Sequence, residues 1–383
     1  MTLLRPYRRW WAPAILVLLC IPAILQLLPG NGRLSAQTVE GRKPALLPQL
    51  PTGLRTLQHF PAALDAYLDD HFGGRGLVLA GHGALRYWLR SPVSERVVYG
   101  RDGWLFLTDN RVLEQTLGAL IRTDAVSHLV SLLAEINARL SANGRQFLAA
   151  LIPNKHTIYK RYLPVWAAEE AGRTEYDLFL AQMAQAGVAT IDLRPPLRLA
   201  AASEEPIFYS TDTHWNRLGA LTAFDAIAAT LGKPHWAADP AQVLGAPVAR
   251  PGGDLARFLA VNWLLADRDR DLAIEDAIKR AVEWGDYVQR SYEVAGTGEK
   301  GTVLVVGDSF SRDLLRPYFA RSVARLVWVH HQGCQFDWSD VDRFNPDTVL
   351  FLMAERLVHA CLNNRPVGMD PQPQAPVPMT SSK

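Results

Sequence analysis

Four apolar runs, at residues 147–152, 303–306, 326–329 and 348–352, most constrain how this chain can fold. None of them alternates apolar with polar residues, as a strand with one solvated face would. Uniformly apolar strands are typical of parallel sheets that helices cover on both faces. Helical patterns separate several of these runs, so the sequence predicts a three-layer α/β/α domain with a parallel sheet.

The predicted helices and strands alternate along most of the chain. The spacing of apolar residues predicts helices over 123–143, 176–185 and 216–231. A further short strand is predicted over 188–193. In sheets of this type, ligands bind beyond the carboxyl ends of the strands. The segments that follow the strands are therefore the places to look for chemistry.

The segment T-V-L-V-V-G-D-S-F-S-R, residues 302–312, joins a predicted strand to a predicted helix. Gly307 allows the tight turn between the two elements. Ser309 would then stand at the carboxyl edge of the sheet, where backbone N–H groups and the helix dipole face a developing oxyanion. The alternative is that Asp308 or Ser309 only caps the helix.

A base for such a serine is offered by Y-S-T-D-T-H-W-N, residues 209–216. A serine hydroxyl needs a base, usually a histidine that a third group orients. Asp212 and His214 lie two residues apart, so in an extended segment they project to the same side. The alternatives are a loop with Asp212 or Thr213 near the next N-cap, or a metal pair completed by His330 and His331. A zinc site needs three or four ligands, and we predict no metal.

The N-terminal segment has the pattern of a membrane anchor. Arg5, Arg8 and Arg9 precede an apolar stretch that we assign to a transmembrane helix over 10–29. About 20 apolar residues suffice to span a bilayer, and the stretch is longer than a cleavable signal core. An uncleaved anchor is therefore favoured over a removed signal peptide. The arginines would hold residues 1–9 in the cytoplasm and place the rest outside.

The remaining chain divides by composition into three parts. Residues 30–60 have the composition of a linker, 61–365 form the predicted catalytic domain, and 366–383 form a proline-rich tail predicted to be disordered. Lysine and arginine number 40 against 38 acidic residues, so nothing indicates a nucleic-acid partner. Cys334 and Cys361 would lie in an oxidising compartment, where they either form a disulfide or remain two separate buried thiols.

Six blocks, in this order, resemble a known family: the SGNH-hydrolase-like O-acetyltransferases of bacterial exopolysaccharide export, of the AlgJ/AlgX type. Each block alone is weak evidence, whereas six in order are specific. They cover most of residues 95–360. The blocks are V-Y-G-R-D-G-W-L-F (98–106), L-I-P-N-K-H-T-I-Y-K-R-Y-L-P (151–164), T-D-T-H-W-N (211–216), G-G-D-L-A (252–256), G-D-S-F (307–310) and the region 343–357, which ends in A-E-R-L.

The resemblance implies an SGNH-hydrolase-like, flavodoxin-like fold and a catalytic triad. Ser309 would be the nucleophile, His214 its base and Asp212 the orienting acid. The serine block follows the Asp-x-His block, the reverse of ordinary SGNH hydrolases, as in a circular permutation of that fold. The usual second oxyanion donor is not recognisable, and Asn154 is nominated for it.

Further side chains near the predicted strand ends are candidates for substrate contact. Lys155 and Arg312 would meet an acidic sugar or the acyl carbonyl, or else form solvated surface and structural ion pairs. Trp215 would stack on a sugar or pack behind the histidine, and Trp104 is a second candidate that more often belongs to a core.

The resemblance implies acetyl transfer to an exopolysaccharide through an acyl-serine, with no cofactor. Because acetyl-CoA is cytoplasmic, a membrane-bound O-acyltransferase partner would supply acetyl groups to this chain, anchored in the inner membrane with its catalytic domain in the periplasm. The alternatives are a carbohydrate acetylesterase or deacetylase with the same triad, and a non-catalytic binding subunit of an export complex. The sequence does not indicate which polymer is modified.

Overall fold

The computed structural model describes residues 44–363 apart from 72–73, 91–95, 168–171, 275–280 and 286–290, together with residues 11, 13–17 and 20. The chain forms two compact units, so the range predicted as one catalytic domain is divided. Unit 1 comprises Met1–Asp109, Ser210–Thr213 and Ala249–Asp267. Unit 2 comprises Asn110–Tyr209, His214–Val248 and Arg268–Lys383.

Unit 2 is built on a six-stranded sheet with the order β3-β10-β8-β9-β7-β6. The first four strands run parallel, as predicted. The last two pair antiparallel, so the prediction of a wholly parallel sheet is wrong at this edge. Only six residues join β6 to β7, too few for the crossover that parallel neighbours require. The strands are β3 (Gln146–Ile152), β6 (Ala281–Trp284), β7 (Ser291–Ala295), β8 (Glu299–Gly307), β9 (Val323–His330) and β10 (Thr348–Ala354).

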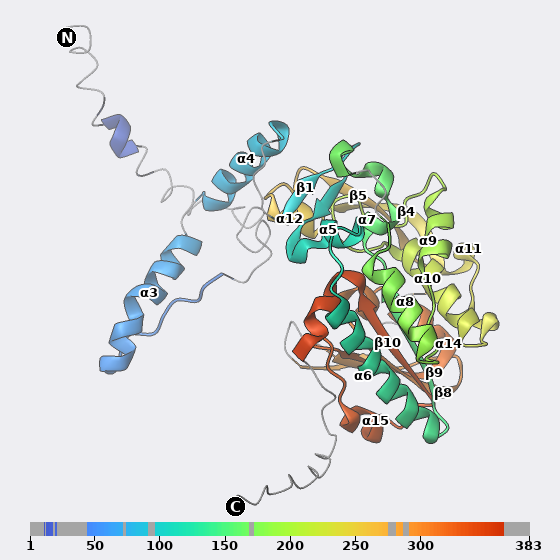
Figure 1. Ribbon diagram of the computed structural model, residues 1–383. Coiled ribbons are helices and arrows are strands. Elements are labelled where there is room, and N and C mark those ends of the chain that lie inside the picture. The colour runs from blue at the N-terminus through green and yellow to red at the C-terminus, as the bar shows by residue number, and fades with distance from the viewer. Residues whose placement is uncertain are drawn as a thin grey trace, which may run out of the picture. The chain divides into compact units, whose positions relative to one another are not determined.

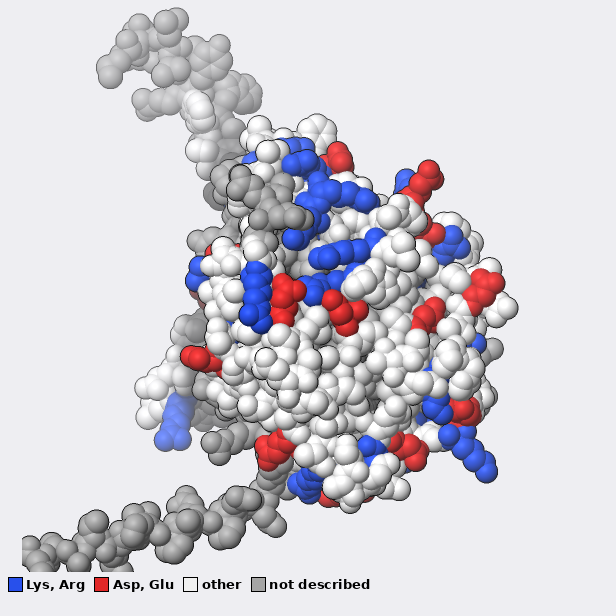
Figure 2. All heavy atoms as spheres, turned by 45° about the vertical axis from the view of Figure 1, so that its right-hand side comes forward, with Lys and Arg blue, Asp and Glu red and all other residues white. Residues whose placement is uncertain are grey.

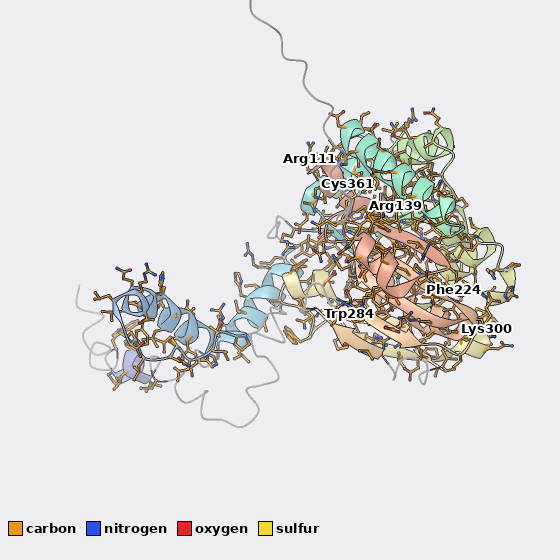
Figure 3. All side chains as sticks on the ribbon, turned by 90° about the horizontal axis from the view of Figure 1, so that it is seen from below. Arg111, Arg139, Phe224, Trp284, Lys300 and Cys361 are labelled. Carbon is orange, nitrogen blue, oxygen red and sulfur yellow. A yellow bond between two sulfur atoms is a disulfide. The ribbon has the colours of Figure 1, made fainter. Side chains whose placement is uncertain are left out.

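Helices cover the sheet because its strands are apolar on both faces. One set of alternate strand residues, which includes Leu304, Val306 and Phe351, joins a single buried cluster with α6, α8 and α15. Figure 1 shows α6 and α8 lying across this side of the sheet. In Figure 3, Arg139 of α6 and Cys361 lie on the same side of the sheet. These helices are α6 (Thr123–Ala142), α8 (Glu175–Gln185) and α15 (Trp338–Phe344).

The alternate strand residues on the opposite face of the sheet, such as Val305 and Leu350, are equally buried. Phe224 of α10 packs against Tyr318 and Phe319 of α14, and α14 packs on β9. This arrangement accounts for the absence of polar alternation in the strands. The remaining helices of unit 2 are α5 (Val112–Thr116), α7 (Lys155–Ile158), α9 (Arg194–Ala201), α10 (Arg217–Thr230), α11 (Pro240–Val243), α13 (Ser309–Arg312) and α14 (Arg316–Ser322), with 3-10 turns at Lys160–Tyr162, Val165–Ala167, Pro234–Trp236 and Glu355–Asn363.

Unit 1 contains helices and a hairpin that the sequence analysis did not assign. Helix α3 begins at Leu54, inside the predicted linker, and the predicted boundary at 61 coincides with Pro61 within that helix. Helix α4 buries its small residues, and a Cβ on Gly83 would lie 2.3 Å from the carbonyl oxygen of Leu259. The elements are α3 (Leu54–Asp70), α4 (Arg75–Trp88), β1 (Val97–Tyr99), β2 (Leu105–Leu107) and α12 (Asp254–Phe258). The strands β4 (Leu244–Pro251) and β5 (Ala266–Leu272) form a further two-stranded sheet, and the 3-10 turn Asp109–Arg111 joins the units along the chain.

Three other predictions of the sequence analysis have different outcomes in the structure. The predicted strand 188–193 is reduced to one bridge between Thr190 and Ala149, because the segment pairs only at the sheet edge. Cys334 and Cys361 form a disulfide, with 4.9 Å between their Cα atoms. Among the described residues no helix is both long and apolar enough to cross a bilayer. Most of the predicted anchor 10–29, and the predicted tail 366–383, lie outside the described residues.

Candidate active site

The turn that follows β8 presents Ser309 at the carboxyl edge of the parallel strands. Ser309 is exposed and is the first residue of α13, whereas Gly307 and Asp308 on its N-terminal side are buried. Glycine is favoured at position 307 by a close approach, because a Cβ there would lie 2.1 Å from the Oγ of Ser311 unless that hydroxyl rotated away. Helix α13 has only one turn, so its dipole contributes less than the sequence predicted. Within the described part of the chain, the N–H of Ser309 donates to no protein acceptor.

Asp308 anchors this turn to the neighbouring strand. Its Oδ1 accepts the N–H of Phe310 at 3.0 Å, and its Oδ2 accepts the N–H of Ala354, at the end of β10, at 2.7 Å. Burial acts to raise the pKa of Asp308, but His331, a nearby arginine and the Ala354 N–H outweigh it and lower the pKa to about 2. Asp308 therefore caps the helix, as the alternative interpretation held, and the same bonds fix the position of the serine.

His214, the predicted base, lies within hydrogen-bonding distance of Ser309. Its Nε2 lies 2.8 Å from the Oγ of Ser309, although 95 residues separate the two in the chain. This distance is within the hydrogen-bonding range of a nucleophile and its base. The histidine follows a narrow loop that is closed by two backbone bonds, from Tyr209 N–H to the His214 carbonyl at 3.2 Å and from Asn216 N–H to the Ile207 carbonyl at 2.9 Å. The loop therefore holds the imidazole against the serine turn.

Trp215 packs behind the histidine, which is one of the two alternatives that the sequence left open. Its side chain is fully buried, and its indole N–H donates to the carbonyl of Phe310 at 3.0 Å. The imidazole of His214 lies 4.7 Å from the Phe310 ring, centroid to centroid. Asn216 then caps α10 by accepting the N–H of Gly219, so neither Asp212 nor Thr213 is the N-cap. Base, tryptophan and helix cap thus follow one another in three consecutive residues.

The predicted acid, Asp212, belongs to unit 1 and is held by residues of that unit. Its Oδ2 accepts the N–H of Asp254 at 2.9 Å. Asp254 in turn accepts the N–H and the hydroxyl of Thr213, at 2.8 and 2.6 Å. A Cβ on Gly253 would lie 2.2 Å from the Cβ of Asp212, so only glycine permits this approach. The block G-G-D-L-A, to whose residues the sequence analysis assigned no individual function, therefore supports Asp212.

Asp267 completes the support of this segment within unit 1. Its Oδ1 accepts the Ser210 hydroxyl and the Thr211 N–H, at 2.8 and 3.0 Å, and its Oδ2 accepts the Thr211 hydroxyl. The segment 210–213 consequently has fixed backbone and side-chain positions without belonging to a strand. The role of Asp212 as the acid that orients His214 stays a prediction.

Lys155 and Arg312, the two basic residues predicted to contact substrate, both interact with other groups of the protein. Lys155 is buried, and its Nζ donates to the Tyr209 carbonyl at 3.1 Å. Arg312 pairs with its neighbour Asp313 at 3.0 Å. Arg312 therefore fits the ion-pair alternative, whereas Lys155 is neither solvated surface nor in an ion pair that the structure shows. Substrate contact for both residues stays a prediction.

Asn154 follows β3 and is almost fully buried, and neither polar atom of its carboxamide has a hydrogen-bond partner among the residues that the structure describes. Strand β10 separates β3 from β8, so roughly 10 Å lies between the strand that precedes Asn154 and the strand that precedes Ser309. An oxyanion donor is more easily supplied by residues that follow β10 itself.

Arg356 occupies such a position, and the sequence analysis did not assign it a role. It follows β10 by two residues, and its guanidinium lies 5.0 Å from the centroid of the Phe310 ring, next to Ser309 in the chain. Its charge acts on the buried Asp308 carboxylate and lowers the pKa of that group, although among the described residues Arg356 forms no close ion pair. The A-E-R-L block of the sequence contains this arginine. We did not select it as an oxyanion donor, because arginine is not the residue type that usually has this role in such folds.

The two histidines of the metal alternative are engaged elsewhere. The Nδ1 of His331 accepts the N–H groups of Gly333 and Cys334, so its Nε2 carries the proton, 3.6 Å from Asp308. The Nδ1 of His330 accepts the N–H of Gln332 at 2.8 Å. Both imidazoles therefore stabilise the segment that follows β9, and His331 adds to the field that keeps Asp308 ionised.

The chain is similar to known proteins over much of its length. The family model of the SGNH hydrolase-like domain of acetyltransferase AlgX matches residues 97–336. Proteins named probable alginate O-acetylase AlgJ are 28% identical over 259 residues in Pseudomonas aeruginosa (65% of this chain, 64% of theirs) and 28% identical over 208 residues in Pseudomonas putida (54% and 52%). The chain thus spans about half to two thirds of their length.

Among solved structures, a DHHW family protein from Eubacterium siraeum has a similar fold. The TM-score is 0.50 with 16% sequence identity, over 70% of this chain and 99% of that one. Similarity at this level of identity concerns the fold alone.

Proposed function

Because the chain belongs to the AlgX family of SGNH hydrolase-like domains, we propose that it is a polysaccharide O-acetyltransferase that carries the acetyl group on Ser309. The observation that supports this most strongly is the 2.8 Å contact between His214 Nε2 and Ser309 Oγ. A histidine at this distance from an exposed serine at a strand end is the arrangement of acyl transfer.

The reaction proceeds in two displacements. His214 takes the proton of the Ser309 hydroxyl as Oγ attacks the carbonyl carbon of an acetyl donor. The tetrahedral intermediate collapses with loss of the donor alcohol, which receives the proton from His214. A sugar hydroxyl then attacks the acetyl-serine with His214 as base, and the sugar ester leaves while Ser309 regains its proton. General acid–base help of this kind contributes about 10²–10⁴-fold.

Hydrogen-bond donors must stabilise the negative charge of each intermediate. The first is the N–H of Ser309, which has no other acceptor among the described residues. Arg356 is the second, because it follows the adjacent strand and its charge lies beside Phe310. Asp212, held by Gly253 and Asp254 within unit 1, orients the imidazole of His214 and stabilises its protonated form.

The predicted anchor over 10–29 and the Cys334–Cys361 disulfide together support a periplasmic catalytic domain on the inner membrane. A membrane-bound O-acyltransferase would deliver acetyl groups there, and anchoring raises the effective concentration of the two proteins. The relatives named alginate O-acetylase favour an acidic polysaccharide. Figure 2 shows lysine and arginine side chains gathered in the upper half of the face in view, a distribution compatible with an anionic polymer.

The serine assignment is tested with Ser309→Ala in the full-length protein. We expect hydrolysis of 4-nitrophenyl acetate to fall by at least 10³-fold, because the nucleophile is lost. Ser131→Ala is the matched control, since Ser131 is exposed on α6 and its hydroxyl bonds only to the Ser127 carbonyl. Full activity of the Ser309→Ala protein would contradict the proposal.

Transfer is separated from hydrolysis by supplying acetyl donor and an oligosaccharide together. Acetylated oligosaccharide, detected by mass spectrometry and absent with Ser309→Ala, is the expected result. Release of free acetate alone would assign the same residues to an acetylesterase. Failure of Ser309 to react with a fluorophosphonate would indicate a non-catalytic subunit.

A further inference from the structure

A pocket in unit 1 is lined mainly by aromatic side chains. Its volume is about 240 Å³, and Tyr87, Trp88, Tyr99 and Trp104 form much of its wall, with Arg90 at the rim. Tyr87 and Trp88 end helix α4, whereas Tyr99 and Trp104 flank the turn between β1 and β2. All of the lining residues belong to unit 1, whereas Ser309 and His214 belong to unit 2. This pocket therefore uses neither the serine nor its base.

The hairpin turn explains why this pocket is open at one side. Residues Asp102 and Gly103 adopt positive φ angles of 53° and 80°, and the turn is closed by a bond from Gly100 N–H to the Trp104 carbonyl at 2.7 Å. The glycines at 100 and 103 line the pocket with backbone alone. Because glycine carries no side chain, neither position places a bulky group at the opening.

Two polar groups in the pocket have unused hydrogen-bonding capacity. The Tyr99 hydroxyl is buried and has no hydrogen-bond partner in the described part of the chain. Burial raises the pKa of this phenol, so it stays a neutral donor. The Arg90 side chain is exposed, and among the described residues no carboxylate pairs with it. A buried hydroxyl without a partner is costly, and a ligand hydroxyl would satisfy it.

Trp88 provides the accessible apolar face. Its side chain is 76% exposed, far more than a tryptophan that serves only to fill a core. Trp104 is 7% exposed and forms the floor, stacked at 6.4 Å on Phe106. The arrangement thus combines an exposed aromatic face, a rigid aromatic floor, a hydroxyl donor and a cation.

We propose that this pocket binds one pyranose unit of an acidic polysaccharide, as a sugar subsite separate from Ser309 and His214. The aromatic faces would contact the C–H face of the ring, the Tyr99 hydroxyl would bond a ring substituent, and Arg90 would pair with the sugar carboxylate. A purely apolar ligand would leave the hydroxyl unsatisfied and the guanidinium unused. The inference rests on the proposed function only in taking a polysaccharide as the ligand.

The subsite would hold the polymer by a unit that does not react. Binding energy from a part of the substrate remote from the chemistry lowers the concentration of polymer needed and keeps it at the enzyme between transfers. Removal of the pocket should therefore change sugar binding and leave the chemistry at Ser309 unchanged.

The test is titration calorimetry of the full-length protein with a β-1,4-linked hexamannuronate, with cellohexaose as a neutral probe. Trp88→Ala should weaken hexamannuronate binding about tenfold. Arg90→Gln should weaken hexamannuronate binding and leave cellohexaose binding unchanged. Trp166→Ala is the matched control, because Trp166 is 68% exposed and lies outside this pocket.

Hydrolysis of 4-nitrophenyl acetate by the same variants separates this proposal from that of the active site. It needs no sugar, so Trp88→Ala and Arg90→Gln should retain wild-type rates. Wild-type hexamannuronate affinity in Trp88→Ala, or no binding of either oligosaccharide by the wild-type protein, would overturn the subsite.

Discussion

The segments that carry Ser309 and Asp212 are held in place by different means. Ser309 follows β8, which pairs with β10 and β9 on its two sides, so the backbone of the sheet positions the serine. Asp212 lies in a four-residue part of unit 1 that is held by side-chain bonds from Asp254 and Asp267. A sheet tolerates change in any one side chain, whereas the segment 210–213 depends on a few specific groups.

Among changes to the supports of these two segments, the largest effect is expected from filling the space beside Asp212. Gly253→Ala would place a Cβ 2.2 Å from the Cβ of Asp212, an atom that no side-chain rotation can move away. The backbone of the acid segment must shift, and we expect 4-nitrophenyl acetate hydrolysis to fall by about a hundredfold, since a misplaced orienting acid costs a triad heavily.

Gly81→Ala is the control for this change. A Cβ on Gly81, in α4 of the same unit, would meet nothing within 4 Å and should stabilise the helix slightly. Wild-type activity in Gly253→Ala would show that the position of Asp212 does not matter to the reaction, and would remove it from the proposed triad.

The serine segment has a glycine of its own, and a smaller effect is expected there. In Gly307→Ala the new Cβ would meet the Oγ of Ser311, which can rotate away at the cost of the bond that it accepts from the Trp328 indole at 2.9 Å. A buried N–H left without a partner costs roughly 1–3 kcal/mol, and we expect a loss of this size in urea unfolding.

A double variant tests this explanation of Gly307. If the hydroxyl is the main obstacle, Gly307→Ala combined with Ser311→Ala should be no less stable than Ser311→Ala alone. Additive losses would instead locate the obstacle in the backbone of the turn.

The same contrast explains what the sequence could predict. The strands at 303–306 and 348–352 were predicted correctly because burial on both faces leaves uniformly apolar runs. The serine turn followed from them, since the end of a parallel strand is a fixed place in this kind of fold. The antiparallel edge was missed because β6 and β7 are short, and Glu283 and Glu293 interrupt their apolar pattern.

The supports of Asp212 could not be predicted in the same way. Gly253, Asp254 and Asp267 lie more than 40 residues from the acid, and no local periodicity links them to it. The Asp-x-His spacing indicated the chemistry of the segment but not which unit of the molecule holds it. Arg356 was missed for a related reason, because its place beside Phe310 depends on strand order.

Acid should weaken the anchor of the serine segment. Asp308 has a pKa near 3.8 in an unfolded chain and about 2 in the fold, so the unfolded state binds more protons between these values. The stability contributed by this carboxylate, roughly 2 kcal/mol, is present above pH 4 and is lost as the pH falls towards 2.

Asp308→Asn isolates this contribution. The variant should be less stable than the wild type in urea unfolding at pH 7, and the difference should shrink at pH 2.5. A difference that is the same at both pH values would mean that the carboxylate acts through hydrogen-bond geometry alone and not through its charge.

The smallest effect is expected for Asp267→Asn in the acid segment. The amide oxygen can still accept from the Ser210 hydroxyl and the Thr211 N–H, and the amide nitrogen can donate to the Thr211 hydroxyl, which reverses its role. Only the charge is lost, and a charge-assisted bond exceeds a neutral one by about 1 kcal/mol. Asp267→Ala removes all three acceptor interactions and should cost more stability and more esterase activity than the asparagine variant. If the two variants lose activity equally, the charge of Asp267 matters more than its bonds, and the segment that carries Asp212 is held by electrostatic attraction instead of by geometry.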